Sequence, residues 1–141
     1  MTRLLIVQTR YFDKIADELL AGASAELAAR GVAFETVSVP GALEIPQAVA
    51  MAEKSGQFDG AIALGCVMRG ETSHYDIVTG ESARGLMDIA IKKKFPIGNA
   101  ILTVETEDQA WARADRKQGD KGKEAAVACL DVLSIKSGWA K

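Results

Sequence analysis

Histidine and cysteine are scarce in this sequence, with one histidine and two cysteines in 141 residues. The cysteines have no CxxC spacing and form no cluster with the histidine, so the sequence predicts no metal site. Cys66 and Cys129 both lie inside apolar runs, which is typical of small side chains buried in a protein core. We therefore expect two reduced, buried thiols.

The chain also lacks a strong excess of charge and a long apolar segment. Its formal net charge is −2, which gives no general attraction to nucleic acid or to an anionic membrane. The longest apolar run is far too short to span a bilayer, and the N-terminus carries no signal-peptide pattern. We therefore expect a cytoplasmic protein in which any recognition of phosphate is confined to a local site.

Strand-like and helix-like patterns alternate along the whole chain. The apolar fraction of 48% and the charged fraction of 26% are ordinary for a globular protein, and we expect one domain over residues 1–141. Short apolar runs predict strands at residues 2–8, 32–39, 60–67 and 97–104. Helical periodicity predicts helices at residues 15–30, 44–54, 75–94, 107–116 and 123–137.

This alternation predicts a parallel α/β sheet with right-handed helical connections and helices on both faces. For these strands we expect a doubly wound sheet of order 2-1-3-4, in which the order reverses between the first and third strands. Ligands of such sheets bind beyond the carboxyl ends of the strands at the point of reversal. The topology therefore predicts that residues 10–13 lie beside residues 68–74.

The stretch LGCVMRGETSHYD, residues 64–76, reaches this point of reversal. It begins as an apolar strand, continues through a polar loop, and arrives at His74 just before a helical pattern. A lone histidine is more often structural or merely exposed. Its position here favours the alternative of proton transfer, because an ordinary imidazole titrates near neutral pH.

Two polar segments are candidates for binding an anion. Residues 70–73, Gly-Glu-Thr-Ser, could bind one through backbone N–H groups, or could simply cap the following helix. No Walker A or GxGxxG pattern is present, which disfavours a nucleoside triphosphate or a dinucleotide. The basic residues near the last two helices form either a solvated charged surface or a phosphate clamp; they are Arg113, Arg116, Lys117 and Lys121.

Two loops at strand ends could contact a flat or polar ligand. Residues 40–46, PGALEIP, offer exposed backbone and the carboxylate of Glu44, although Glu44 could equally be placed to favour the helix dipole. Tyr11 and Phe12 offer an aromatic face that could stack on a flat ring. For at least one of these two aromatic side chains we expect core packing instead.

Four segments together resemble the lumazine synthase family, whose members make 6,7-dimethyl-8-ribityllumazine in riboflavin biosynthesis. Residues 39–46, VPGALEIP, resemble the family's VPGA-aromatic-EIP segment, and residues 63–78, ALGCVMRGETSHYDIV, resemble its ALG-x-VIRGET-x-HFD-x-V segment. Residues 101–114, ILTVETEDQAWARA, and the GDKG of residues 119–122 match the remaining segments. The resemblance implies a flavodoxin-like three-layer sandwich over the whole chain.

The resemblance also implies a reaction and a set of site residues. It implies that 5-amino-6-(ribitylamino)uracil condenses with 3,4-dihydroxy-2-butanone 4-phosphate, releasing phosphate and water without a cofactor. His74 matches the family's general acid and base. The residues that match its phosphate site are Gly70, Glu71, Thr72 and Arg113. The residues that match or adjoin its pyrimidine and ribityl site are Tyr11, Ala42, Leu43, Glu44, Cys66, Val67, Met68, Asn99 and Lys121.

The family builds its active sites between neighbouring subunits of a ring of five. By this resemblance, one chain would supply His74, Tyr11 and Glu44, and the next chain would supply Asn99 and Arg113. The assembly would be a pentamer, a decamer of two pentamers, or a sixty-subunit shell.

The chain departs from the family pattern at two positions. Phe12 stands where many members have asparagine, and Asn99 where many have an aromatic or apolar residue. Both changes could alter substrate fit, and neither removes a proton-transfer group. Two other interpretations stay open: a non-catalytic flavodoxin-like module that binds a flavin or phosphate, and a different enzyme acting on phosphosugars.

Overall fold

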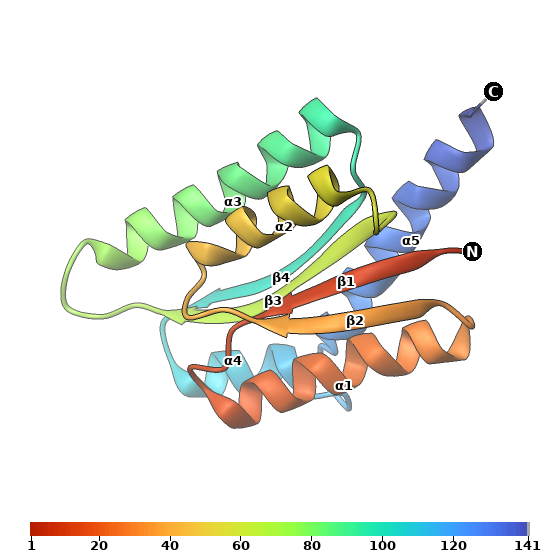
Figure 1. Ribbon diagram of the computed structural model, residues 1–141. Coiled ribbons are helices and arrows are strands. Elements are labelled where there is room, and N and C mark those ends of the chain that lie inside the picture. Colours follow the sequence, from red (N-terminus) through yellow and green to blue (C-terminus); the bar gives the residue numbers. More distant parts are fainter. Residues whose placement is uncertain (141) are drawn as a thin grey trace.

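Strands and helices alternate through the computed structural model, which describes residues 1–140 (Figure 1). The strands are β1 (Arg3–Gln8), β2 (Ala33–Ser38), β3 (Gly60–Met68) and β4 (Ile97–Val104). The helices are α1 (Asp13–Ala29), α2 (Glu44–Ser55), α3 (His74–Lys93), α4 (Glu107–Ala114) and α5 (Lys121–Trp139). Among these described residues, no helix combines the length and apolarity that crossing a membrane requires.

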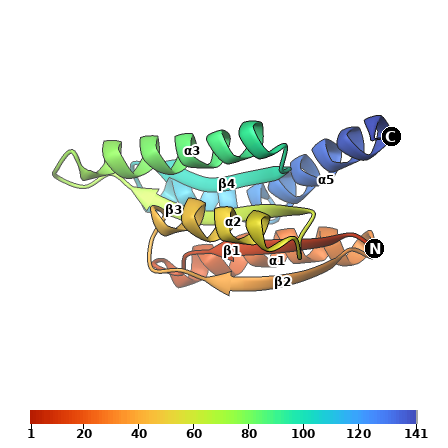
Figure 2. The same ribbon diagram turned by 45° about the horizontal axis from the view of Figure 1, so that its top comes forward.

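The sheet has the predicted parallel arrangement, with the order β2-β1-β3-β4. At its carboxyl edge, Gln8 of β1 pairs with Ser38 of β2 and with Leu64 of β3. The connection from β3 to α3 extends beyond this edge in both views (Figures 1 and 2). The loops after β1, β2 and β3 therefore meet at one end of the molecule.

Each face of the sheet is covered by helices, with α1, α4 and α5 on one face and α2 and α3 on the other (Figure 1). Along β1, Leu4 and Ile6 pack on the first face, while Leu5 and Val7 pack on the second. Burial on both faces explains why β1 is a continuous apolar run rather than an alternating one.

The predicted boundary between the last two helices was wrong. Helix α4 ends at Ala114 rather than at residue 116, and α5 begins at Lys121 rather than at residue 123. Asp115 leaves the helical conformation at ψ 125°. Its carboxylate then accepts hydrogen bonds from the Lys117 backbone N–H and the Gln118 side chain, each at 2.9 Å. An aspartate that satisfies nearby donors in this way favours a turn over a continued helix.

Local side-chain chemistry accounts for several helix ends and one close contact. The Thr106 hydroxyl accepts a hydrogen bond from the Gln109 backbone N–H at 3.2 Å, and so caps α4. Gly31 and Gly56 follow α1 and α2 with φ of +67° and +73°, a conformation that glycine adopts without strain. In α3, a Cβ on Gly85 would lie 3.0 Å from Pro46 of α2, so close packing accounts for this glycine.

Candidate active site

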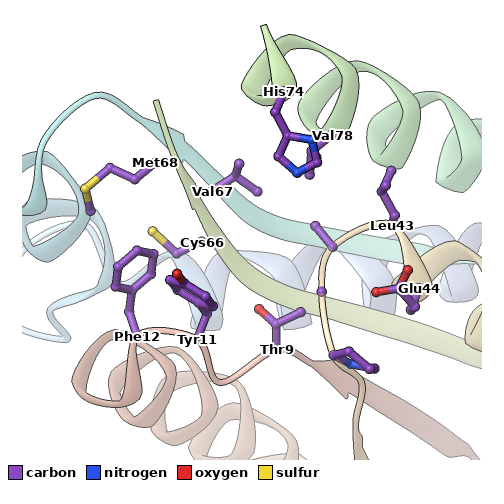
Figure 3. Close-up of a pocket in the computed structure, with 13 residues that line it drawn as sticks. Thr9, Tyr11, Phe12, Leu43, Glu44, Cys66, Val67, Met68, His74 and Val78 are labelled. Atoms are coloured by element: carbon purple, nitrogen blue, oxygen red, sulfur yellow. The ribbon is translucent and has the colours of Figure 1, made fainter. Parts of the chain in front are cut away.

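A pocket of about 500 Å³ opens where the strand order reverses, at the carboxyl ends of β1 and β3 (Figure 3). Its walls come from the β1–α1 connection, the β2–α2 loop, the end of β3 and the start of α3. The residues that line it are Thr9, Tyr11, Phe12, Pro40, Gly41, Ala42, Leu43, Glu44, Cys66, Val67, Met68, His74 and Val78. The predicted meeting of residues 10–13 with residues 68–74 is confirmed.

Tyr11 and Phe12 are adjacent aromatic residues of the pocket with different surroundings. Their rings meet edge to face, with centroids 4.9 Å apart and an interplanar angle of 73°. Phe12 packs against the hydrophobic core, whereas Tyr11 is 81% exposed. The core therefore anchors one aromatic ring, which leaves a face of the other open to a flat ligand.

The β2–α2 loop presents a carboxylate to the pocket. Glu44 is half-buried in the first turn of α2, where the helix dipole favours a negative charge. A Cβ on Gly41 would lie 3.1 Å from Glu44 Oε1, so the glycine leaves room for this carboxylate. The Glu44 N–H donates to the Gly41 carbonyl at 3.1 Å, which fixes the turn. The loop thus offers acceptor oxygens to a ligand with hydroxyl or N–H groups.

His74 is the first residue of α3 and its side chain is exposed. Its backbone N–H donates to the Thr72 hydroxyl at 3.3 Å, which connects the preceding loop to the helix. The imidazole is directed into the same pocket as Tyr11 and Glu44, with Val78 beside it one helical turn later (Figure 3). An imidazole, an open aromatic face and a carboxylate therefore share one cavity.

Arg69 holds the loop that precedes His74. Its guanidinium carbon lies 4.3 Å from the centroid of the Tyr75 ring, and its nitrogens lie 3.5 Å from Asp76 and 3.3 Å from Glu105. Two carboxylates balance this one cation, so the loop gains no net positive charge from it. A phosphate bound at residues 70–72 would need a cation from another source.

Cys66 lines the pocket beside Val67 and Met68 at the end of β3. The structure corrects the expectation that this thiol is buried like Cys129, since Cys66 is only half-buried. Desolvation raises the pKa of Cys66 from 9.0 to about 11. The side chain is therefore a neutral thiol at physiological pH and contributes an apolar wall rather than a nucleophile.

Six of the predicted site residues do not line this pocket: Gly70, Glu71, Thr72, Asn99, Arg113 and Lys121. Asn99 is exposed on the edge strand β4, where its Oδ1 accepts from the Ile101 N–H at 2.8 Å. Arg113 Nη1 donates to the Gln109 carbonyl at 2.9 Å, and Lys121 pairs with Glu124 at 2.9 Å. One copy of the chain thus forms the part of the site around Tyr11, Glu44 and His74, without these basic groups.

Five lining residues are absent from the set that the family resemblance implied, and most carried a signal in the sequence. Val78 lies one helical turn after His74, a spacing that places both on one face of a helix. Pro40 and Gly41 begin the loop that was identified, and Phe12 follows Tyr11. Thr9 had only its position after a strand as a signal, because the predicted strand ends at residue 8 and the sequence does not show that its alternation continues to residue 9.

Comparison with known proteins identifies the same family along nearly the whole chain. The family model described as 6,7-dimethyl-8-ribityllumazine synthase matches residues 1–137. A protein of that name from Methylobacterium radiotolerans is 57% identical over 95% of this chain and 82% of its own length. The 6,7-dimethyl-8-ribityllumazine synthase 1 of Rhodopseudomonas palustris (strain ATCC BAA-98 / CGA009) is 54% identical over 99% of this chain and 88% of its own length. The 6,7-dimethyl-8-ribityllumazine synthase 1 of Rhizobium meliloti is 52% identical over 94% of this chain and 90% of its own length.

Proposed function

Since the chain belongs to the 6,7-dimethyl-8-ribityllumazine synthase family, we propose that its pocket condenses 5-amino-6-(ribitylamino)uracil with 3,4-dihydroxy-2-butanone 4-phosphate. The product is 6,7-dimethyl-8-ribityllumazine, an intermediate of riboflavin biosynthesis, and phosphate and water are released. The steps are additions and eliminations with no net transfer of electrons to an external acceptor. Proton transfer and positioning are therefore sufficient, and no cofactor takes part.

The pyrimidine substrate binds along the wall formed by Tyr11 and the β2–α2 loop. The open face of Tyr11 stacks on the pyrimidine ring. Ala42, Leu43 and Glu44 hold the ribityl chain, whose hydroxyl groups donate to the Glu44 carboxylate. Cys66 to Met68 close the opposite wall, where the neutral thiol and apolar side chains exclude water.

His74 transfers the protons of the reaction. The 5-amino group of the pyrimidine attacks the ketone carbon, and His74 protonates the developing alkoxide so that water can leave and an imine forms. Removal of a proton next to the imine then expels phosphate and leaves an enol, which becomes a ketone. The ribitylamino nitrogen attacks this ketone, and a second water leaves as the second ring closes. The position of the imidazole in the same cavity as Tyr11 and Glu44 is the observation that supports this role most directly (Figure 3).

The phosphate of the second substrate binds at the loop Gly70, Glu71 and Thr72, and Arg113 of an adjacent subunit supplies the missing positive charge. Two observations support this assignment. The Arg69 charge is balanced by Asp76 and Glu105, and Arg113 of the same chain does not line the pocket. Asn99 and Lys121 arrive with Arg113 from the adjacent subunit, in a ring of five in the cytoplasm.

The test is to mix the protein with both substrates and to follow the absorbance of the lumazine product. We expect formation of the product well above the spontaneous rate. A rate equal to the spontaneous condensation would overturn the proposal and favour a binding module. Turnover of the butanone phosphate without the pyrimidine would instead identify a different enzyme acting on phosphosugars.

A further inference from the structure

Thr9 is a polar side chain buried at the inner end of the pocket. It follows the last residue of β1, and it is only 5% exposed although it lines the cavity. Its backbone N–H donates to the Leu64 carbonyl of β3 at 3.0 Å. This bond continues the pairing of the two strands for one more residue. The sheet therefore fixes the backbone of Thr9, and with it the position of the Thr9 Cβ.

The side chain of Thr9 extends from the face of the sheet that α2 and α3 cover. Side chains alternate along a strand, so Thr9 continues the series of Leu5 and Val7, which pack on the face covered by α2 and α3. A Cβ on Gly65 of β3 would lie 2.9 Å from Thr9 Oγ1. The missing side chain of Gly65 thus provides the space that the Thr9 hydroxyl occupies.

The Thr9 hydroxyl is left available to a ligand. No hydrogen bond joins it to another residue in the described part of the chain, whereas the adjacent Gln8 donates to Ser38 at 3.1 Å. The Thr9 oxygen is also not sealed from solvent. A hydroxyl has one hydrogen to donate and two lone pairs, so this group can pair with a ligand that enters the pocket.

We propose that Thr9 is a specificity-determining residue that hydrogen-bonds to a hydroxyl of the ribityl chain. This assignment rests on the proposed function, and the neighbours of Thr9 decide which part of the substrate it meets. Thr9 lies between Tyr11, which takes the flat ring, and Glu44, whose carboxylate suits a polyol (Figure 3). The phosphate loop lies outside the pocket lining. A sugar-alcohol chain carries groups that both donate and accept, as the Thr9 hydroxyl does.

The first test compares Thr9→Val with Thr9→Ser. Valine keeps the shape of threonine without the hydroxyl, and serine keeps the hydroxyl without the methyl group. We expect Thr9→Val to weaken binding of 5-amino-6-(ribitylamino)uracil about 10-fold, measured by calorimetry and as KM. Thr9→Ser should stay within about 3-fold, and the KM for the butanone phosphate should not change. Equal affinity of Thr9→Val and the unmodified chain would overturn the proposal.

A second ligand identifies the atom that Thr9 meets. In a 5-amino-6-(alkylamino)uracil, the chain hydroxyls are absent while the ring is the same. We expect this compound to bind equally to the unmodified chain and to Thr9→Val. A similar loss of affinity for both compounds would place the hydrogen bond on the ring and contradict the ribityl assignment.

A third variant redirects the hydroxyl without removing it. In Gly65→Ala, the added Cβ displaces Thr9 Oγ1, the end of a small side chain that can rotate. We expect the ribityl compound to bind less tightly to this variant, and Thr9→Val to lose little more when the two changes are combined. Fully additive losses would contradict the proposal. Product formation by the unmodified chain separates these outcomes from a failure of the proposed function.

Discussion

His74 and Cys66 line the same pocket, and their surroundings differ. The His74 side chain is exposed at the start of α3, whereas Cys66 is half-buried at the end of β3. Desolvation keeps the Cys66 thiol neutral by raising its pKa to about 11. The proposed mechanism therefore uses the imidazole of His74, rather than the thiol, for proton transfer.

Replacing His74 tests this assignment. We expect His74→Ala to lower kcat about 10-fold or more, at the low end for loss of a general acid and base, because the substrates also condense without an enzyme. His74→Gln should be equally slow, since an amide forms hydrogen bonds but does not shuttle protons. Steady-state rates of lumazine formation provide the measurement. An unchanged kcat in either variant would remove His74 from the mechanism.

The neutral thiol of Cys66 gives a pH-dependent prediction. Its pKa is raised from 9.0 to about 11, so the thiolate fraction at pH 8 is about 100-fold lower than for an ordinary cysteine. We expect alkylation by iodoacetamide to accelerate up to about pH 11. Up to about pH 9 this raised pKa does not affect folding stability. As the pH rises from 9 towards 11, folding stability falls, since the unfolded chain loses the thiol proton more readily than the folded chain. Cys66→Ala, which retains Cys129, supplies the background rate, and a rate that levels off near pH 9 would contradict the prediction.

At the level of elements, α5 lies unusually close to its neighbours because glycines stand at the contacts. A Cβ on Gly122 of α5 would overlap the backbone carbonyl of Leu19 in α1. A Cβ on Gly98 of β4 would overlap the carbonyl of Ala125 in α5. Backbone atoms cannot turn aside as a flexible side chain can, so α5 would have to move away from the sheet.

The substitution Gly122→Ala tests this packing. Overlap with the backbone of α1 should cost about 3 kcal/mol of unfolding free energy, the upper range for overpacking a core. Gly138→Ala is the matched control, because it lies in the same helix and a Cβ there meets nothing within 4 Å. The control should change stability by less than about 1 kcal/mol. Urea unfolding at one protein concentration compares them, and equal stability of the two variants would contradict the close approach.

At the level of the whole molecule, the pocket of one chain is an incomplete site for a phosphorylated substrate. It contains the carboxylate of Glu44 and the imidazole of His74, but Arg113 does not line it. A ring of identical subunits solves this because each heterologous interface joins one surface of a chain to a different surface of the next. We propose that catalysis requires this assembly.

Mixed assemblies test the shared site. His74→Ala and Arg113→Ala chains should each be slow alone, since every site in either assembly lacks one group. When the two chains are co-expressed in equal amounts, about a quarter of the sites would contain both intact residues, and activity should return to about that fraction. Light scattering confirms that the mixture has the same size as the parent assembly. A mixture no more active than its parents would show that both residues act within one chain.

The sheet, its strand order and the elements at its carboxyl edge follow from sequence patterns alone. Strand-like and helix-like hydrophobic patterns can be recognised locally along the chain. Because parallel strands are joined by right-handed connections, few sheet topologies are compatible with that order of elements. The place of the motif around His74 could likewise be predicted, because a loop that leads from a parallel strand into a helix must lie at this edge. The single domain expected over residues 1–141 stays a prediction.

Which side chains share the cavity depends on the folded chain. The direction of Thr9 depends on the absence of a side chain at Gly65, fifty-six residues later, and the early end of α4 depends on how Asp115 satisfies its own neighbours. Such contacts join residues distant in the chain or compete with helical bonding, so no local pattern encodes them. The resemblance assigns His74 and Arg113 to one site built from two chains, and within one folded chain only His74 lines the pocket.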